Sequence, residues 1–309
     1  MILDESDVRR LLRMEELIPA MATALADFSA GRVAQPPRLV VPVAGHGGLL
    51  YVMPAHVPAR DPRAGALGAK LVTLYPGNVG VPTHHATVLL FRPETGEPLA
   101  TMDGRLITEM RTAAVSAVAT DLLARADASA LAILGAGVQA RGHLEALRLV
   151  RAFREVRVWS PRRAREFAER HGVRAAASAA DAVRGADVIV TATTATEPVL
   201  RGEWLSPGAH VVSVGAPQPS WRELDDETLR RATVFVDSRE AARRESGDVI
   251  AAAGRVAAEI GEVVSGAHPG RASADEITLF KSVGLAVEDV VAADLVHRNA
   301  LRAAGARAT

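Results

Sequence analysis

The sequence of 309 residues contains no cysteine. Disulfide bonds, thiolate nucleophiles and cysteine-ligated zinc are therefore excluded, and the absence fits a reducing compartment. The sequence also lacks any uncharged apolar run of the roughly 18 residues that a membrane helix needs. Its N-terminal segment has no basic stretch followed by an apolar one, as a secretory signal would. These absences predict a soluble, cytoplasmic protein that does not bind a membrane.

An excess of either charge is lacking as well, since Lys and Arg together number 36, as do Asp and Glu. A net charge of zero gives no electrostatic reason to expect a nucleic-acid partner. No G-x-S-x-G motif is present, so a serine hydrolase is not indicated. The adjacent His84 and His85 would point to opposite faces of a strand and could not bind one ion together. We expect no metal site.

The two ends of the chain differ in pattern from its middle. A helix is predicted over residues 5–31, and "RPETGEP" (92–98) predicts a hairpin turn. Residues from about 246 onward are predicted to be mostly helical, since apolar positions recur at helical spacing over 282–305. The region before residue 120 is predicted to be α+β, with strands expected in "PPRLVVPVA", "GLLYVMPAHV", "GALGAKLVTLYPG" and "ATVLLFRPETGEPLATMDG".

The middle of the chain, from about residue 125 to 240, alternates short apolar runs with helix-length segments. Such alternation predicts a parallel, doubly wound sheet, and continuous apolar runs fit strands covered on both faces. The predicted fold class is therefore α/β, with a Rossmann-type sheet. The expected strands are "ALAILGAG", "EVRVWS", "DVIVTAT", "HVVSVGA" and "TVFVDS".

The first of these strands leads into a glycine turn of the form G-x-G-x-x-A, residues 135–140. Gly135 permits a tight turn, Gly137 lets the backbone approach a pyrophosphate, and the small Ala140 lets the following helix pack closely. The N-terminus of that helix would present free N–H groups to phosphates. The pattern predicts a dinucleotide-binding site.

The second expected strand indicates which dinucleotide binds. NAD-binding domains usually place a carboxylate at its end to bind the ribose 2′-hydroxyl. Here Ser160 takes that position, followed by Arg162 and Arg163. A hydroxyl and guanidinium groups suit a 2′-phosphate, so NADP(H) is predicted, with NAD possible. The alternative is that the arginines begin a solvated helix.

Three basic residues lie in apolar surroundings in or near the first region: Arg38, Lys70 and Arg111 at the apparent start of a helix. Each must face water, pair with a carboxylate or bind an anion. Spacing alone leaves these alternatives open.

Six blocks, in order, resemble the ornithine cyclodeaminase/mu-crystallin family: "LGAKLVTLYPGN", "TGEPLATMDGRLITEMRTAAVSAVA", "LGAGVQARGH", "VSVGAPQPSWRELD", "VFVDSREAARRESGD" and "FKSVGLAVEDVVAA". The resemblance covers nearly the whole chain. It implies an α+β substrate and dimerisation domain (1–120 plus about 285–309), an inserted Rossmann domain (121–284) and a homodimer. It also implies hydride transfer at the α-carbon of an amino or imino acid.

The same resemblance implies roles for individual residues. Lys70 and Arg111 match catalytic and substrate-carboxylate positions, and Arg38 matches a third substrate contact. Positions matched to cofactor binding, with the glycine turn and the second strand end included, are Thr112, Gly135, Gly137, Val138, Gln139, Ser160, Arg162, Arg163, Val214, Gly215, Ser282 and Val283.

One departure from the family pattern changes the expected reaction. Ornithine cyclodeaminases carry G-x-D-x-P-G-K where this sequence places Pro217, which cannot transfer a proton. The segment "GAPQPSWREL" is similar to the mu-crystallin and ketimine-reductase type. The expected function is therefore NAD(P)H-dependent reduction of a C=N bond next to a carboxylate, or the related amino-acid dehydrogenation. The alternatives are ornithine cyclodeaminase and a non-catalytic protein that binds NADPH or a small ligand. Asp237 is either a polar residue that supports the site from behind or, as expected here, a helix cap at the end of the sheet.

Overall fold

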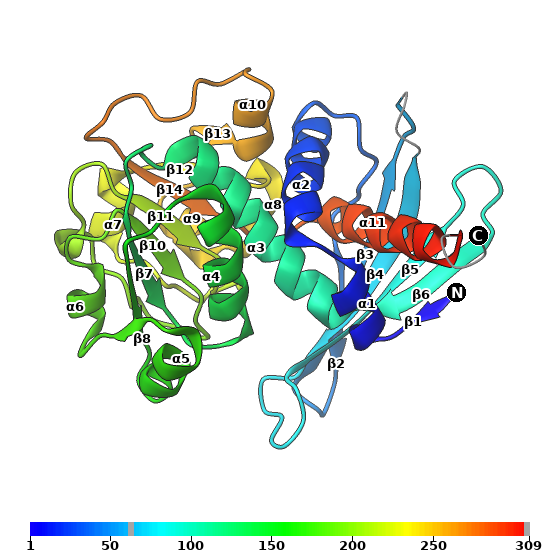
Figure 1. Ribbon diagram of the computed structural model, residues 1–309, viewed down its shortest axis with the longest axis horizontal. Helices are drawn as coiled ribbons and strands as arrows, with labels where there is room; N and C mark the ends of the chain where they lie inside the picture. The colour runs from blue at the N-terminus through cyan, green and yellow to red at the C-terminus, as the bar shows by residue number, and fades with distance from the viewer. Residues whose placement is uncertain (61–64, 306–309) are drawn as a thin grey trace. The chain divides into compact units, whose positions relative to one another are not determined.

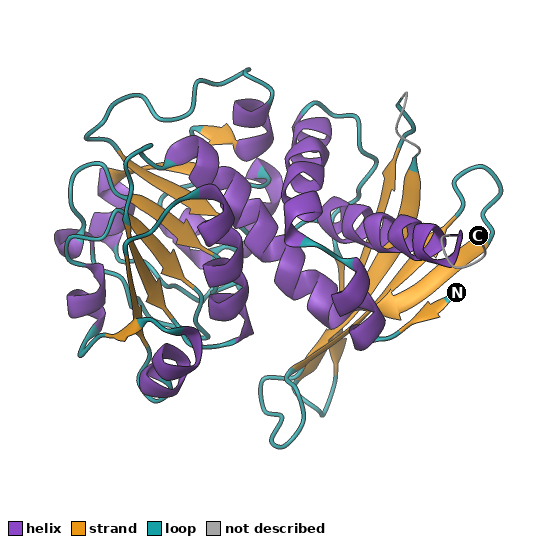
Figure 2. Ribbon diagram, in the orientation of Figure 1, coloured by secondary structure: helices purple, strands orange, loops and turns teal. Residues whose placement is uncertain are grey.

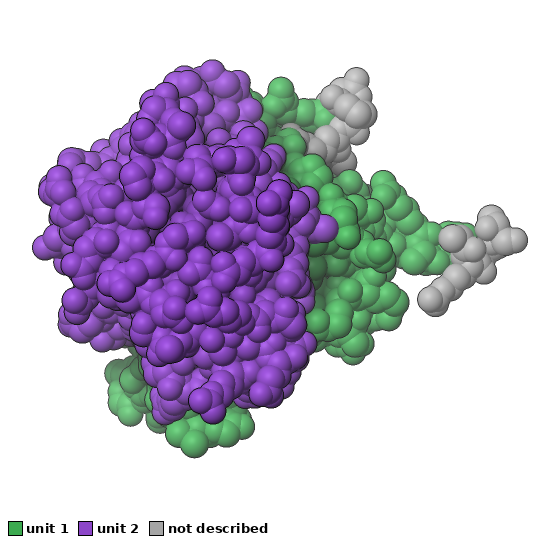
Figure 3. All heavy atoms as spheres, turned by 60° about the vertical axis from the view of Figure 1, so that its left-hand side comes forward, with its two compact units in different colours: residues 1–111, 285–309 green, residues 112–284 purple. Residues whose placement is uncertain are grey.

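The computed structural model describes residues 1–60 and 65–305. The chain forms two compact units, coloured separately in Figure 3. Unit 1 combines both ends of the chain, residues 1–111 and 285–309, and unit 2 comprises residues 112–284. The boundary near residue 111 falls inside one helix, α3 (Gly104–Leu123).

Unit 1 contains a six-stranded sheet of order β1-β6-β5-β4-β3-β2 (Figure 1). β1 pairs in parallel with β6, and the remaining neighbours are antiparallel. The predicted turn at residues 92–97 connects β5 to β6 and is confirmed. The strands are β1 (Ile2–Leu3), β2 (Leu39–Val43), β3 (Gly48–Val57), β4 (Ala66–Leu74), β5 (His84–Phe91) and β6 (Pro98–Asp103).

Three helices of unit 1 lie on one side of this sheet (Figure 2): α1 (Glu5–Leu11), α2 (Met14–Ser29) and α11 (Ala286–Gly305). The single helix predicted over residues 5–31 is wrong, because the chain becomes extended at Leu12. Asp4 caps α1 by accepting a hydrogen bond from the Asp7 N–H, and α2 begins after Arg13. The break lets both Leu11 and Leu12 be buried.

The helix-covered face of the sheet is buried, and the opposite face is only half-buried. Met53, Lys70, Val88 and Met102 are neighbours in register on four strands, and all four are buried. A basic side chain therefore lies within an apolar row. The opposite face carries half-buried apolar side chains: Val52, Leu67, Leu71, Leu89, Phe91 and Leu99.

Unit 2 contains an eight-stranded sheet, parallel throughout, of order β13-β12-β14-β11-β10-β7-β8-β9. All five predicted strands are present. The strands are β7 (Ala130–Leu134), β8 (Glu155–Trp159), β9 (Arg174–Ala175), β10 (Val188–Thr191), β11 (His210–Ser213), β12 (Ala232–Val236), β13 (Ala258–Glu259) and β14 (Ile277–Lys281).

Two strands of this sheet, the short β13 and the longer β14, were not expected from the sequence. β14 lies in the C-terminal region predicted to be mostly helical, yet it pairs between β11 and β12. All five of its residues are buried, so the run is too short and too uniform to show a period. The helices of unit 2, besides the second half of α3, are α4 (Val138–Val150), α5 (Ala164–His171), α6 (Ala179–Val183), α7 (Asp226–Arg231), α8 (Arg239–Glu245), α9 (Gly247–Ala251), α10 (Ile260–Val264) and the 3₁₀ turn η1 (Gly202–Trp204).

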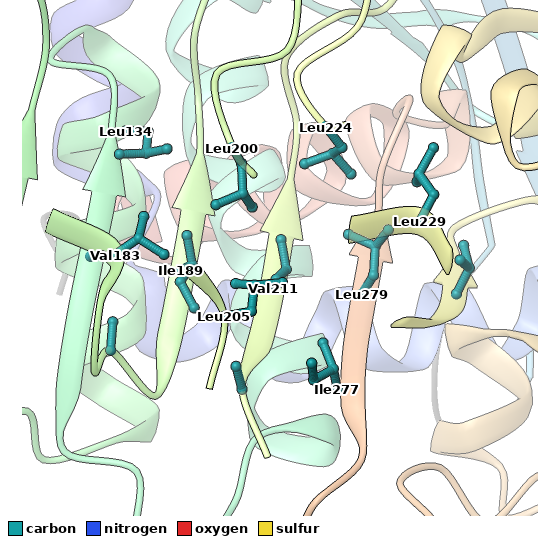
Figure 4. Close-up of a cluster of buried hydrophobic side chains, with 14 of the residues drawn as sticks. Leu134, Val183, Ile189, Leu200, Leu205, Val211, Leu224, Leu229, Ile277 and Leu279 are labelled. Carbon is teal, nitrogen blue, oxygen red and sulfur yellow. The ribbon is translucent and has the colours of Figure 1, made fainter. Parts of the chain in front are cut away.

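The core of unit 2 explains why its strands have continuous apolar sequences. Ala132, Ile189, Val211, Leu279 and Val234 follow one another in register across five strands and belong to one buried cluster (Figure 4). Residues between them on the central strands are buried on the other face. Burial of each large aliphatic side chain stabilises the fold by about 1.5–3 kcal/mol. The chain leaves β7 toward β8 on one side and returns in β10 on the other, which creates the crevice where doubly wound sheets bind ligands.

Candidate active site

Gly135 ends β7 at this crevice, and no other residue fits there. Its φ is +122°, and an added Cβ would lie 2.3 Å from the Ala192 carbonyl oxygen. Its N–H donates to the Trp159 carbonyl oxygen at 2.8 Å. The tight turn inferred from the sequence is therefore present at the end of β7.

The next glycine leaves open space at the start of α4. Gly137 occupies the N-cap position without any side-chain cap, and an added Cβ would meet only the Arg163 guanidinium, at 3.9 Å. Val138, the first residue of α4, is 57% exposed, whereas Ala140 is fully buried. The buried Gln139 Oε1 has no hydrogen-bond partner within residues 1–60 and 65–305. The free N–H groups at the start of α4 and the open space beside Gly137 fit a dinucleotide pyrophosphate at this turn.

The end of β8 carries a hydroxyl and two guanidinium groups. Ser160 follows directly on β8 and is half-buried, whereas Arg162 and Arg163 are exposed. In the part of the chain that the structure describes, no carboxylate pairs with either arginine. The Arg163 guanidinium lies beside Gly137, so the positive charge is next to the glycine turn.

The loop after β11 adopts a strained conformation around Val214 and Gly215. An added Cβ on Gly215 would lie 2.3 Å from Glu223 Oε1, and the fully buried Ala216 has a φ of +53°. Non-glycine residues with positive φ persist only where surrounding contacts hold them, often at functional sites.

The carboxylate of Glu223 supplies those contacts. Its Oε1 accepts hydrogen bonds from the Thr193 N–H and hydroxyl at 2.8 and 2.7 Å. Its Oε2 accepts from the Thr191 hydroxyl, the Ser213 hydroxyl and the Gly215 N–H at 2.8, 3.1 and 2.9 Å. Glu223 is fully buried, so one carboxylate joins the ends of β10 and β11.

A buried lysine extends this network to β14. The ammonium of Lys281 donates to the Ser213 hydroxyl, the Gly215 carbonyl oxygen and Asp248 Oδ2 at 3.0, 2.5 and 3.1 Å. Asp248 Oδ1 in turn accepts from the Glu223 N–H at 3.1 Å. Sequence reasoning missed Glu223, Asp248 and Lys281. A lysine inside the apolar run "ITLFKSVG" was the available signal.

Asp237 plays a different part from the one expected. Ser238, not Asp237, caps α8 by accepting from the Ala241 N–H. Asp237 Oδ2 accepts from the Ser282 hydroxyl and from the Val283 and Gly284 N–H groups at 2.9, 2.8 and 2.7 Å. The helix-cap expectation is therefore wrong, because the buried carboxylate instead binds the turn after β14. Burial raises the pKa of the Asp237 carboxyl, and these donors oppose the rise.

Thr112 begins the unit 2 portion of α3 and is buried. Its carbonyl oxygen lies 2.9 Å from the Ser116 hydroxyl, which also contacts His143 Nε2 at 2.9 Å. His143 belongs to α4, so this contact links α3 to the helix that follows the glycine turn. Burial lowers the pKa of the His143 imidazole to about 4, which keeps it neutral near pH 7.

In unit 1, Lys70 lies on the buried face of β4 and is only 2% exposed. Its ammonium lies 2.6 Å from Asp289 Oδ2 and 3.4 Å from the Thr108 hydroxyl. Of the alternatives open at the sequence level, pairing with a carboxylate is the one observed. Asp289 lies in the first turn of α11, which packs on this face of the sheet.

Arg111 binds the same carboxylate as Lys70. Its Nε donates to Asp289 Oδ1 at 3.0 Å, and its Nη1 donates to Glu288 Oε2 at 2.5 Å. Arg111 lies within α3 rather than at its start, since that helix begins at Gly104. Both acids are fully buried, and sequence reasoning missed them although an acidic pair interrupts the apolar run "AVEDVVAA".

The electrostatics of Lys70 connect the three basic residues of the sequence prediction. Burial lowers the pKa of the Lys70 ammonium to about 8, and the negative charge of Asp289 opposes that effect. The positive charges of Arg111 and Arg38 lower this pKa further. Arg38, half-buried just before β2, therefore lies within electrostatic reach of Lys70. An ammonium with a pKa near neutrality, beside guanidinium groups, can bind a carboxylate and transfer a proton.

Among the described residues, no group of three His, Asp or Glu side chains is arranged to hold a metal ion. No helix in the described ranges is long and apolar enough to cross a membrane.

Residues 1–304 match the model of the ornithine cyclodeaminase/mu-crystallin family. The chain belongs to this family. It is 53% identical to the ketimine reductase mu-crystallin of Mus musculus, with 96% of each chain covered. Family membership agrees with the two groups of residues described above, one around the glycine turn and one around Lys70.

Two solved structures resemble the whole chain. The Δ1-pyrroline-2-carboxylate reductase of Thermococcus litoralis, in complex with NADH and L-proline, is 40% identical with a TM-score of 0.92, and 98% of each chain is covered. An archaeal alanine dehydrogenase dimer with bound NAD is 37% identical with a TM-score of 0.90, covering 98% of this chain and 96% of its own. The Rossmann-type α/β fold predicted from the sequence is confirmed.

Proposed function

We propose that this protein is an NAD(P)H-dependent oxidoreductase that reduces a C=N bond next to a carboxylate, as in a cyclic ketimine acid. The observation that carries the proposal is the buried Lys70 ammonium, held by Asp289 next to the Arg111 guanidinium. Relatives named ketimine reductase and Δ1-pyrroline-2-carboxylate reductase support the reaction class.

Each basic residue of unit 1 has a separate role in this proposal. Arg111, assisted by Arg38, binds the substrate carboxylate through charge-assisted hydrogen bonds and so fixes the neighbouring carbon. Lys70 donates a proton to the imine nitrogen. With a pKa of about 8, most Lys70 side chains are protonated at pH 7, and the proton is released more readily than from an exposed lysine.

A nicotinamide bound at the glycine turn would supply hydride chemistry for the imine carbon. Hydride addition to carbon and proton transfer to nitrogen together convert C=N into CH–NH. In the proposal, the glycine turn of Gly135 and Gly137 and residues Val138 and Gln139 bind the pyrophosphate. The residues that would line the nicotinamide are Thr112, Val214, Gly215, Ser282 and Val283.

We further propose that NADPH is preferred over NADH. Ser160, Arg162 and Arg163 follow β8 with no carboxylate at its end, and the Arg163 guanidinium lies beside Gly137. A 2′-phosphate would gain charge-assisted hydrogen bonds from these groups. The preference is tested by measuring kcat/KM for both cofactors, and a higher value with NADH would refute it.

The proposed assembly is a homodimer, in which the substrate region (1–120 with about 285–309) supplies the contact and the Rossmann region (121–284) binds the cofactor. The half-buried apolar face of the unit 1 sheet, from Val52 to Leu99, supports self-association, since monomers rarely expose large apolar patches. The archaeal alanine dehydrogenase relative is itself a dimer.

The function is tested by following NADPH oxidation with cyclic ketimine carboxylates and with pyruvate plus amines. NAD(P)⁺ reduction with alanine and ornithine is measured in parallel. Imine reduction is expected. Conversion of ornithine to proline with ammonia release would establish the cyclodeaminase alternative. Tight NADPH binding without turnover of any substrate would establish a binding protein.

A further inference from the structure

Lysine is rare in this chain, and its placement is informative. Only two of the 36 basic residues are lysines, Lys70 and Lys281, and the rest are arginines. Both lysines are buried, and each forms an ion pair with an aspartate, at 2.6 Å for Lys70 and 3.1 Å for Lys281. All the exposed cations are therefore arginines, and lysine occurs only where a compact ammonium is enclosed by protein.

An arginine at position 70 would keep a positive charge for Asp289 but could not release a proton near neutral pH. The small ammonium can do both. Lysine at this position therefore permits proton transfer as well as charge pairing, which makes the partner carboxylate a residue of functional interest.

We propose that Asp289 is a positioning residue for imine reduction: its carboxylate holds the Lys70 ammonium and the Arg111 guanidinium in one arrangement, as proton donor and carboxylate receptor. This inference rests on the function proposed above. One carboxylate can set the spacing of both groups because Oδ2 faces Lys70 and Oδ1 faces Arg111. Glu288 binds Arg111 through Nη1, and this neighbouring buried acid provides a matched control.

Asp289 also sets the ionisation of Lys70. Burial alone would drive this ammonium toward the neutral amine, and the Asp289 charge is the largest effect that opposes it. The positive charges of Arg111 from α3 and Arg38 before β2 act in the same direction as burial. His84 from β5 also faces Lys70, and Glu288 from α11 places a negative charge on the far side of Arg111. Asp289 is the one carboxylate among the described residues that forms an ion pair with Lys70, so the Lys70 pKa is expected to fall when its charge is removed.

The presence of only two lysines allows a direct test. In protein labelled with [ε-¹³C]lysine, two side-chain resonances are expected, and Lys70→Arg identifies them. In the wild type, Lys70 is expected to titrate near pH 8. In Asp289→Asn the midpoint should fall by about one to three pH units, the usual effect of an adjacent opposite charge. In Glu288→Gln the Lys70 midpoint should stay near the wild-type value.

Kinetics supply the second measurement. Since the proton donor must be protonated, kcat/KM for the imine should decline as pH rises through the Lys70 pKa, and this decline should move to lower pH in Asp289→Asn. Glu288→Gln should instead raise KM by about tenfold through loss of a charge-assisted hydrogen bond to Arg111, with the pH profile unchanged.

An Asp289→Asn protein whose Lys70 titrates as in the wild type would overturn the proposal, as would equal pH shifts in both variants. Circular dichroism shows whether each variant folds. If Asp289→Asn fails to fold, Asp289→Glu displaces the charge by one methylene, and an unchanged kcat would then refute the positioning role. If the wild type reduces no imine, the proposed function fails, while the lysine titrations still test the coupling of Asp289 to Lys70.

Discussion

Replacing Glu223 with glutamine removes one charge from the network below the loop of Gly215 without changing the size of the side chain. The backbone N–H groups of Thr193 and Gly215 donate to opposite oxygens of this carboxylate. An amide has only one oxygen, so in either orientation its NH₂ faces one of these two donors. The three hydroxyl groups can rotate, but the backbone donors cannot.

The expected loss of stability follows from the one backbone N–H group that is left without an acceptor. One buried N–H left without an acceptor costs about 1–3 kcal/mol, and the hydrogen bonds that remain lose their charge-assisted strength. Relief of the desolvation of a buried charge offsets part of this loss. We expect Glu223→Gln to lower the free energy of unfolding by about 3 kcal/mol. NADPH binding should also weaken, because the loop that holds Gly215 loses its anchor.

Intrinsic fluorescence is a suitable assay, since all three tryptophans, Trp159, Trp204 and Trp221, belong to unit 2. Urea unfolding followed at these residues gives the stability of that unit. The matched control is Glu240→Gln, because the Glu240 side chain is 77% exposed. Its Oε1 forms a weak surface ion pair with Arg244 Nη1 at 3.6 Å. That variant should change stability by less than about 0.5 kcal/mol. A loss below about 1 kcal/mol in Glu223→Gln would refute the two-acceptor reasoning.

Three further predictions concern the substrate, the cofactor and the assembly. Arg111→Ala should raise KM and lower kcat together, and an unchanged kcat/KM would remove Arg111 from the site; Arg111→Lys, which keeps a charge for Glu288, controls for destabilisation. Ser160→Asp should lower kcat/KM with NADPH by about tenfold or more, through repulsion of the 2′-phosphate, and should spare NADH; equal losses with both cofactors would contradict the assignment. Leu71→Asp on the half-buried sheet face should convert the proposed dimer to monomer in sedimentation velocity, and a dimer that persists in the variant would place the interface elsewhere.

The sequence predicted the parts of the fold that depend on local pattern. The five apolar runs of the middle region became strands because their burial on both faces selects continuous apolar residues. β14 was not predicted for the same reason, because five uniformly buried residues show no alternation of apolar and polar positions. The break between α1 and α2 was missed because Leu12 continues the helical pattern while its backbone is extended.

The residues of the candidate site were likewise predicted only where a local sequence pattern identifies them. The glycine turn could be predicted because the local geometry of the turn and the space around it require Gly135 and Gly137. The acid partners were not, because Asp289 lies 178 residues from Arg111 in the chain. Only tertiary structure brings such residues together. A buried charge requires a partner, so a lysine in an apolar run predicts a carboxylate nearby but not which one.

The two buried lysines nevertheless differ in a way that separates structure from chemistry. The Lys281 ammonium has three protons and three acceptors, Ser213, Gly215 and Asp248, so each proton is already bound. Lys70 has Asp289 at 2.6 Å and a long 3.4 Å contact to Thr108, with no third acceptor among the described residues. Because all three N–H groups of Lys281 are hydrogen-bonded, this ammonium holds the loops around it in place. Lys70 retains an N–H group for a bound substrate, and its pKa of about 8 suits it to donate a proton. The same residue type, buried to the same degree, therefore serves as a structural tie in unit 2 and as the proposed acid in unit 1.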